Sequence, residues 1–362
     1  MMENMDLFKK KLKICFVLPG YTRQAIGGFR IVYEYANRLS DRGYEIYIIC
    51  INKDIMEQFW IPSKIKNIIA NYLTHRGPKW FSINNNVKLL SATNKKDFQS
   101  LKEIDIVIAT AVNTVKYVQD NIKCSKRLYL IQGFENWKYG NEYCYKTYQA
   151  GFQNIVISKW LKDIVDEYSL QPSVLIKNPI DLNNYKVVVP QSKRKLHTIG
   201  LLYHSMESKG VKYSIEAIQI LKRIYVDLEV YMFGVPSKPR NLSWVHYIKE
   251  ATQEQTVEIY NKVTVWMCAS IDEGYGLTGL EAMACGAVLI STQYTGVLEY
   301  AKNEYNALLS PIKDVNALVT NTCRVFNDSG LRQCLIDNAL QTVKSFEWDI
   351  AVNKMENIIS NL

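Results

Sequence analysis

The sequence predicts an α/β fold of two domains, each with a parallel β-sheet covered by helices on both faces. Three observations support this prediction. The chain has 362 residues, which is long for one hydrophobic core and suits two. Short apolar runs alternate with helical segments along both halves, which is typical of parallel sheets. A polar stretch interrupted by Pro190 separates the halves and predicts a linker.

The first domain is expected to span residues 1–182 and to begin with a buried strand. The expected elements are, in order, a strand at 13–18, a helix at 29–41 and strands at 44–51, 104–109, 128–131, 154–157 and 174–177. Arg42-Gly43 predicts the end of the helix. The segment 60–93 is rich in proline, asparagine and aromatic residues, and it predicts a less regular insertion.

The second domain is expected at 197–344, after a linker at 183–196. Its expected elements are a strand at 198–203, a helix at 214–224, a strand at 228–233, a helix at 256–261 and strands at 263–269 and 287–291. Residues 345–362 predict a separate C-terminal helix, because Trp348, Val352, Met355 and Ile359 recur at helical spacing.

The net positive charge of the chain lies entirely in its first half. Residues 1–182 hold 26 Lys and Arg against 17 Asp and Glu, whereas residues 183–362 hold 18 of each. A basic half can bind an anionic membrane surface, and the run from Lys9 to Lys13 would fit such an edge. A solvated charged tail is the alternative. No nucleic-acid-binding module is recognisable, so nucleic acid is not an expected partner.

Composition and motifs exclude several other classes. Apolar residues make up 48% of the chain, but no run of about 18 apolar residues predicts a membrane-spanning helix. The N-terminus lacks the apolar stretch of a secretory signal. The eight cysteines form no C-x-x-C pair and the four histidines lack metal-ligand spacing, so free thiols and no metal are expected. The signatures H-E-x-x-H, G-x-S-x-G and Walker A are absent.

The stretch from Glu273 to Gly286, EGYGLTGLEAMACG, is the most informative feature of the sequence. It places Glu273 and Glu281 around a glycine-rich turn that leads from a strand into a helix. A helix N-terminus favours phosphate, whereas carboxylates favour hydroxyl groups. The combination predicts a ligand with sugars on both sides of a diphosphate. The alternative is that Thr278 to Glu281 form a capping box at the helix start.

This stretch resembles the donor site of retaining glycosyltransferases with the GT-B fold, two Rossmann-like domains facing a central cleft, and especially glycosyltransferase family 4. Both glutamates and the tail Ala282 to Gly286 stand as in that family. The resemblance implies that Glu281 binds the ribose hydroxyls and that the catalytic Glu273 binds the donor sugar. Tyr275, Gly276, Leu277 and Thr278 would hold the far side of the sugar and a phosphate.

Other positions match the family in part. Lys209 stands where a lysine neutralises the diphosphate, and His204 stands where arginine is usual, so both are candidate catalytic residues. The glycine pair Gly27-Gly28 opens the first long helix and lets backbone approach the ligand.

Three further expectations concern the donor and the C-terminus. The family's histidine near the donor sugar is absent, and Gln132 or Glu135 could replace it. Base selection is expected partly near Tyr247. The resemblance also implies that the C-terminal helix crosses back onto the first domain.

The sequence therefore predicts a retaining glycosyltransferase. It would move a hexose or deoxyhexose from a nucleoside diphosphate sugar to a hydroxyl of a glycan or lipid-linked glycan, without metal or another cofactor. UDP-, GDP- and dTDP-sugars all fit. The acceptor would bind the first domain, at the cytoplasmic face of a bacterial membrane in surface polysaccharide synthesis. The alternatives are a nucleotide-sugar epimerase on the same fold and a non-catalytic sugar-nucleotide-binding protein.

Overall fold

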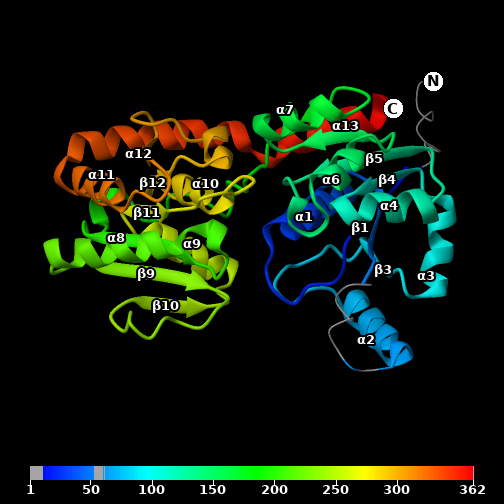
Figure 1. Cartoon of the computed structure of the whole chain (residues 1–362), viewed down its shortest axis with the longest axis horizontal. Helices are drawn as coiled ribbons and strands as arrows, with labels where there is room; N and C mark the ends of the chain where they lie inside the picture. Colours follow the sequence, from blue (N-terminus) through cyan, green and yellow to red (C-terminus); the bar gives the residue numbers. More distant parts are fainter. Residues whose placement is uncertain (1–10, 53–59, 61, 362) are drawn as a thin grey trace, which may run out of the picture. The chain divides into compact units, whose positions relative to one another are not determined.

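The computed structural model describes residues 11–52, 60 and 62–361 and divides the chain into two compact units (Figure 1). Unit 1 comprises the residues up to Ile157, Leu161–Ile176 and the residues from Lys354 onward. Unit 2 comprises Ser158–Trp160 and Lys177–Asn353.

Unit 1 contains a seven-stranded sheet in the order β3-β2-β1-β4-β5-β6-β7, with all neighbouring strands parallel. The strands are β1 (Lys13–Leu18), β2 (Glu45–Cys50), β3 (Lys88–Ser91), β4 (Ile106–Ala109), β5 (Lys126–Ile131), β6 (Gln153–Val156) and β7 (Val174–Leu175). The residues of β1 from Ile14 to Leu18 are all buried, as expected for a strand covered on both faces. The strand order reverses between β1 and β4.

Helices connect the strands of unit 1. They are α1 (Gly27–Asp41), α2 (Ser63–Arg76), α3 (Lys95–Ser100), α4 (Val112–Asn121), α5 (Asn136–Tyr139), α6 (Asn141–Tyr148) and α7 (Lys159–Tyr168), of which α7 begins in unit 2. Helix α1 forms because Ile31, Tyr35 and Leu39 recur every four residues and make a buried stripe. It ends at Arg42, and Gly43 follows with a φ of 96°.

Unit 2 contains a six-stranded parallel sheet in the order β10-β9-β8-β11-β12-β13. The strands are β8 (Thr198–Tyr203), β9 (Glu229–Gly234), β10 (His246–Lys249), β11 (Val265–Cys268), β12 (Val288–Thr292) and β13 (Ala307–Ser310). The strand order reverses between β8 and β11. Because crossovers between parallel strands are right-handed, the helices that follow β8 and β11 cover opposite faces of this sheet.

Helices pack around the sheet of unit 2. They are α8 (Val211–Ile224), α9 (Gln253–Lys262), α10 (Leu277–Ala284), α11 (Val315–Asn327) and α12 (Ser329–Val343). Ala217, Ile218 and Leu221 of α8 pack into a buried cluster with strand residues such as Val265 and Ile290. Helix α13 (Trp348–Asn361) follows, and its residues from Lys354 onward group with unit 1.

Helix α13 is tied to unit 1 by polar contacts as well as by packing. Glu356 forms an ion pair with Arg42, and Lys126 Nζ donates a hydrogen bond to the carbonyl of Ile359 at 3.2 Å. The predicted linker, 183–196, belongs to unit 2 by its contacts. Arg194 in this segment is buried, and it donates hydrogen bonds to the carbonyls of Tyr260 and Val263.

The predicted fold class is confirmed, and every predicted strand and helix is present, with bounds that differ by a few residues at most. The sequence did not predict strands β3, β10 and β13, nor helices α2 to α7, α11 and α12. The segment 60–93 was expected to be irregular, but it contains α2 and β3.

The predicted basic edge at the N-terminus lies partly outside the described residues, which exclude Lys9 and Lys10. Lys13, at the end of this run, begins β1 and pairs with Glu103 at 2.7 Å. Among the described residues, no helix is both long enough and apolar enough to cross a membrane.

Candidate functional site

The topology of unit 2 brings two predicted loops together at the carboxyl edge of its sheet. Strands β8 and β11 are neighbours, with Ile199 opposite Val265. Ligands of open parallel sheets bind at the carboxyl edge where the strand order reverses, which in unit 2 is between these two strands. His204 and Lys209 follow β8, and Glu273 follows β11, so all three lie at this position.

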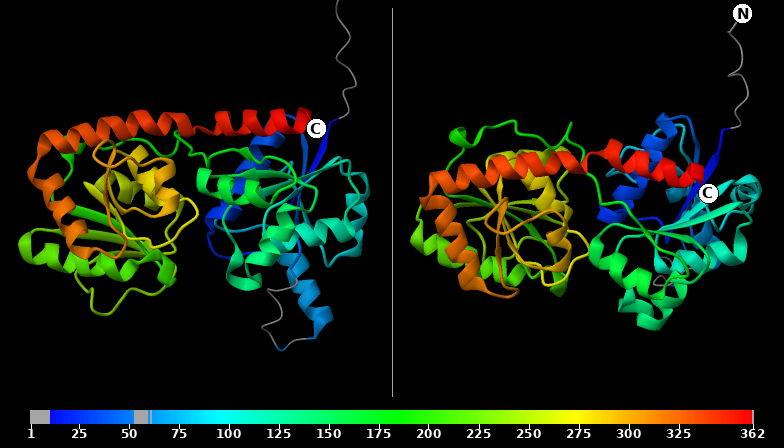
Figure 2. Two further views of the ribbon diagram at one scale, coloured as in Figure 1. Left: turned by 45° about the horizontal axis from the view of Figure 1, so that its top comes forward. Right: turned by 90° about the horizontal axis from the view of Figure 1, so that it is seen from above.

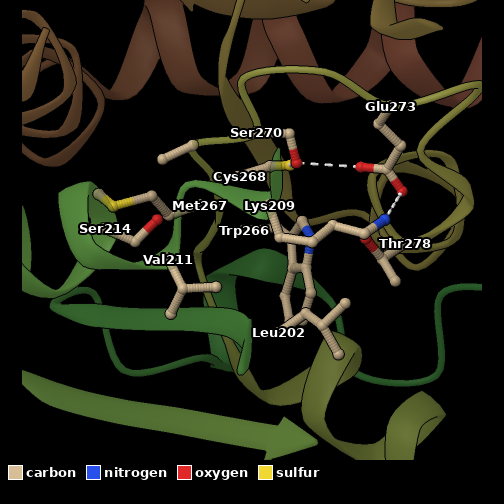
Figure 3. Close-up of a pocket in the computed structure, with 11 residues that line it drawn as sticks. Leu202, Lys209, Val211, Ser214, Trp266, Met267, Cys268, Ser270, Glu273 and Thr278 are labelled. Atoms are coloured by element: carbon tan, nitrogen blue, oxygen red, sulfur yellow. Dashed lines mark hydrogen bonds and ion pairs between the residues drawn. The ribbon is translucent and has the colours of Figure 1, made fainter. Parts of the chain in front are cut away.

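Lys209 and Glu273 form an ion pair at this edge (Figure 3). Ser270 Oγ donates a hydrogen bond to Glu273 Oε2 at 3.0 Å, so each carboxylate oxygen has a partner. The two side chains of the ion pair are 21% and 17% exposed. Both residues were predicted from the sequence, but their pairing was not. An ammonium group has three donors, so Lys209 can hold Glu273 and still contact a second anion.

The backbone fixes the two loops against each other. The Ser208 carbonyl accepts hydrogen bonds from the amides of Ile271 at 2.7 Å and Asp272 at 3.2 Å. Gly210 has a φ of 56°, and a Cβ at this position would lie 1.8 Å from the carbonyl oxygen of Ala269. Only glycine allows this approach. The distance between the β8 and β11 loops therefore depends on Gly210.

Helix α10 begins with a left-handed glycine and without a side-chain cap. Its N-cap is Gly276, with a φ of 85°, and a Cβ there would lie 1.9 Å from the Tyr294 hydroxyl oxygen. Thr278 lies inside the first turn, so the alternative interpretation of Thr278 to Glu281 as a capping box is wrong. The first amides of a helix have no partner within the helix, and this end favours anions.

Glu281 lies in the second turn of α10 and is 4% exposed. Its Oε2 accepts a hydrogen bond from the hydroxyl of Tyr260, on α9, at 2.8 Å. The tyrosine therefore orients the carboxylate that was predicted to bind ribose. In this structure little of the carboxylate surface faces solvent.

His204 is neutral at pH 7 in this structure. Burial and the nearby Lys209 charge lower the pKa of the imidazole below its usual value of 6.5, against a smaller opposing effect of Glu273. Its Nδ1 accepts a hydrogen bond from the amide of Met206 at 3.0 Å, so its proton lies on Nε2. The resemblance placed His204 where arginine is usual in the family. The structure instead provides a neutral N–H donor.

The remaining predicted residues of unit 2 differ in how exposed their side chains are. Tyr275 is buried, with its ring 5.8 Å from that of Tyr300, so its side chain supports the loop and only its backbone can face a ligand. Leu277 and Thr278 are partly exposed. Tyr247 lies on β10, the outermost strand of the sheet, and its hydroxyl donates a hydrogen bond to the carbonyl of Pro236.

The predicted residues of unit 1 meet at the carboxyl edge of the other sheet. Gln132, after β5, donates a hydrogen bond to the Gly28 carbonyl at 3.2 Å. A Cβ on Gly28 would lie 3.3 Å from Gln132 Oε1, so these two residues fit closely. Gly27 opens α1 beside them and is exposed. Glu135 accepts a hydrogen bond from the amide of Val112 at 2.9 Å, and burial raises its pKa to about 7.

Two hollows of unit 2 bear on where a ligand could bind. One is a cavity of about 20 Å³ lined by residues that include Lys209, Glu273 and Thr278 (Figure 3), which is room for about one water molecule. A nucleotide sugar would therefore bind on the open side of this edge. The other hollow, of about 550 Å³, is lined by Thr198 and Glu229 at the amino ends of β8 and β9 and contains none of the predicted site residues.

Several supporting residues were not predicted. Ser270 and Tyr260 orient the two glutamates, and the Tyr300 hydroxyl donates to the Gly276 carbonyl at 2.6 Å. No spacing rule identifies such partners, because they come from other elements. In the part of the chain that the structure describes, no three His, Cys, Asp or Glu side chains are grouped to hold a metal.

Two Rossmann-like units, with a polar edge where the strand order of unit 2 reverses, define the GT-B class of fold. Residues 189–342, which include the Lys209–Glu273 pair and α10, match the family model described as Glycosyl transferases group 1. The match therefore lies within unit 2. The resemblance inferred from the stretch Glu273 to Gly286 is confirmed.

Individual relatives are distant. An uncharacterised glycosyltransferase of Methanocaldococcus jannaschii is 23% identical over 218 residues, which cover 58% of this chain and 59% of that protein. The N,N'-diacetylbacillosaminyl-diphospho-undecaprenol alpha-1,3-N-acetylgalactosaminyltransferase of Campylobacter jejuni is 26% identical over 114 residues, which cover 32% of this chain and 30% of that protein. The chain thus spans 59% or less of the length of these two relatives.

The fold itself extends over nearly the whole chain. HepE of Anabaena, solved in complex with UDP and glucose, has a TM-score of 0.72 and 14% identity, with 97% of this chain and 100% of that chain covered. At this identity the likeness shows the fold alone.

Proposed function

We propose that this protein is a glycosyltransferase that uses a nucleoside diphosphate sugar as donor. The observation that carries the proposal is the Lys209–Glu273 pair, which lies beside the start of α10 at the reversal point of the unit 2 sheet. This edge combines one cation, one carboxylate and a helix N-terminus. These groups suit a diphosphate joined to a sugar, because each end of the ligand finds its chemical complement.

Donor binding would use the pair without breaking it. The ammonium group of Lys209 would contact a phosphate oxygen with a donor that Glu273 does not use. The first amides of α10, at Leu277 and Thr278, would hold the diphosphate, and Glu273 would accept a hydrogen bond from a sugar hydroxyl. Glu281, oriented by Tyr260, would bind the ribose after a small outward rotation.

The chemical step would retain the anomeric configuration and need no metal. The bond between the anomeric carbon and the diphosphate oxygen breaks, and a bond from that carbon to the acceptor oxygen forms on the same face. The acceptor proton passes to the leaving phosphate. Lys209, the Nε2–H group of His204 and the start of α10 would stabilise the charge that grows on the diphosphate. One such donor is typically worth about 3–4 kcal/mol of barrier.

The acceptor would bind unit 1, whose corresponding edge holds Gly27, Gly28 and Gln132. We propose a hydroxyl of a glycan or lipid-linked glycan in bacterial surface polysaccharide synthesis, at the cytoplasmic face of the membrane. Support comes from the name of the Campylobacter jejuni relative, which acts on a diphospho-undecaprenol glycan. The transferred sugar would be a hexose or deoxyhexose.

Thermal unfolding with a panel of nucleoside diphosphates and their sugars, in EDTA, tests donor binding. A ligand at 100 times its dissociation constant adds about 2.7 kcal/mol of stability. We expect one nucleotide class to raise the melting temperature of the wild type and of Lys195→Ala, but not that of Lys209→Ala. Lys195 is a matched control because it also pairs with a glutamate, Glu229. It lies just before β8, at the amino edge of the same sheet.

The outcomes separate the proposal from its alternatives. No shift with any nucleotide would contradict the donor site. A shift followed by conversion of the sugar without an acceptor would indicate an epimerase, and a shift without turnover of any donor would indicate a binding protein.

A further inference from the structure

Helix α2 presents an apolar face to solvent, on the side opposite to the side that packs. It lies against β3, and its buried residues are Ala70 and Thr74. In Figure 1 and in the left view of Figure 2, α2 projects from unit 1 beyond the other helices of that unit. Asn71 and His75 also have partners in unit 1, Thr93 and Asp97, so the surface open to a partner lies on the opposite side of the helix.

The exposed face is a stripe of four large apolar side chains. Ile65, Ile68, Ile69 and Tyr72 are 47%, 67%, 36% and 64% exposed. Their spacing of three and four residues places them on one side of a helix. At roughly 100° per residue, the stripe is centred nearly opposite Ala70 and Thr74. Exposed apolar patches of this kind mark interaction sites.

Basic side chains flank the stripe, and one acidic side chain, Asp97, pairs with His75 in the last turn of α2. Lys64 and Lys66 lie roughly 100° to either side of Ile65 around the helix axis, so they flank the stripe symmetrically. Arg76 is exposed in the last turn. Residues 60–94 contain five Lys and Arg and no Asp or Glu. Long basic side chains can extend from an apolar face toward an anionic layer.

We propose that α2 docks on an anionic lipid surface, with its apolar stripe inserted between the headgroups. A helix of 14 residues is about 21 Å long and cannot span a bilayer, but it can lie in the plane of the interface. A second copy of the chain would carry the same basic charges and repel. An anionic lipid surface can bury the apolar stripe and bind the lysines that flank it.

This inference assigns a surface to the membrane side of the proposed function, but its test needs no enzymatic activity. The full chain is sedimented with vesicles of phosphatidylcholine alone, or with about one-third phosphatidylglycerol added. The stripe variant is Ile68→Glu with Tyr72→Glu. The matched control is Ile224→Glu with Val226→Glu, which makes the same kind of change at exposed positions of unit 2. Unchanged melting temperatures show that the variants fold.

We expect the wild type and the control to bind only the anionic vesicles, and the stripe variant to lose at least tenfold in affinity. Lys64→Ala with Lys66→Ala should lose about 25-fold, because each basic residue near the surface is worth about fivefold. Equal binding by the wild type and the stripe variant would overturn the proposal, as would no binding by the wild type. A dimer in light scattering that the stripe variant converts to a monomer would assign the stripe to a second copy instead.

Discussion

The carboxyl edges of the two sheets lie at equivalent points of topology but are built differently. In unit 2, Gly210 and Gly276 adopt positive φ values and bring loops into contact at distances that no other residue permits. In unit 1, side-chain hydrogen bonds join the equivalent edge, from Gln132 to the Gly28 carbonyl and from Thr110 to the Val17 carbonyl, and a Cβ on Gly133 would meet nothing within 4 Å. A tightly built edge suits a ligand whose shape is constant, and an open edge tolerates change.

This difference agrees with the proposed division of labour. A nucleoside diphosphate presents the same groups to every enzyme that uses it, so Lys209 and Glu273 can be held in advance of binding. Acceptors vary in size and linkage. At the carboxyl edge of unit 1, loop residues can therefore be substituted without destabilising the core. Four predictions test this contrast, from the largest expected effect to the smallest.

Replacing Gly210 by alanine should have the largest effect. The new Cβ would lie 1.8 Å from the Ala269 carbonyl oxygen, at a φ of 56°. We expect a loss of at least about 3 kcal/mol in the free energy of unfolding, measured with urea. Gly133→Ala, on the open edge, should change it by less than about 0.5 kcal/mol. Equal losses would show that the edges do not differ in rigidity.

Glu135 makes the stability of unit 1 depend on pH. Its pKa in the folded chain is about 7, against an ordinary value of 4.5, so the folded state binds more protons between these values. The group therefore destabilises the fold as pH rises from about 4.5 to 7, by an amount on the order of 3 kcal/mol. Glu135→Gln should flatten the pH profile of unfolding, whereas Glu142→Gln, at an exposed position of α6, should leave it unchanged.

Tyr260→Phe should cost about 1–2 kcal/mol of stability, because the buried Glu281 loses a hydrogen-bond donor. Tyr231→Phe is the control, since its hydroxyl donates to Glu229 at 2.6 Å at a more exposed position. Only Tyr260→Phe should also reduce the shift in melting temperature that the donor nucleotide causes. If both variants reduce that shift equally, Glu281 does not hold the ribose.

His204 should have the smallest effect on stability, and its pH dependence should have the opposite sign to that of Glu135. Its pKa is lowered by burial, so the unfolded chain binds its proton more readily. The stability that it contributes is complete above about pH 6.5 and declines as pH falls below that value. His204→Asn should remove this decline, and His246→Asn should not. An unchanged profile in His204→Asn would contradict the neutral imidazole.

Most strands of the two sheets, and the meeting of the loops that follow β8 and β11, could be predicted from the sequence because both depend on local pattern. Buried parallel strands appear as short apolar runs, and the residues that follow β8 and β11 meet because parallel strands end at one edge. The exposed stripe of α2 was missed because its helical spacing lies among prolines, asparagines and aromatics that predict loops. Isoleucines facing solvent do not indicate a core.

The features of the site that the sequence did not predict depend on tertiary contacts. Thr278 and Glu281 have the spacing of a capping box, but packing against Tyr294 turns Gly276 into the N-cap and starts the helix earlier. The pairing of Lys209 with Glu273 joins residues 64 positions apart, and no motif predicts it. The lowered pKa of His204 likewise comes from burial and from Lys209, which the sequence does not reveal.

The rate of sugar transfer measures the central claim most directly. With the donor class identified by thermal shift, transfer to acceptor is followed in EDTA for the wild type, Lys209→Ala and Lys195→Ala. We predict that Lys209→Ala is slower by about a hundred- to a thousandfold, whereas Lys195→Ala stays within about twofold of the wild type. Transfer by Lys209→Ala at the rate of the wild type would contradict the assignment of the Lys209–Glu273 edge as the site of reaction.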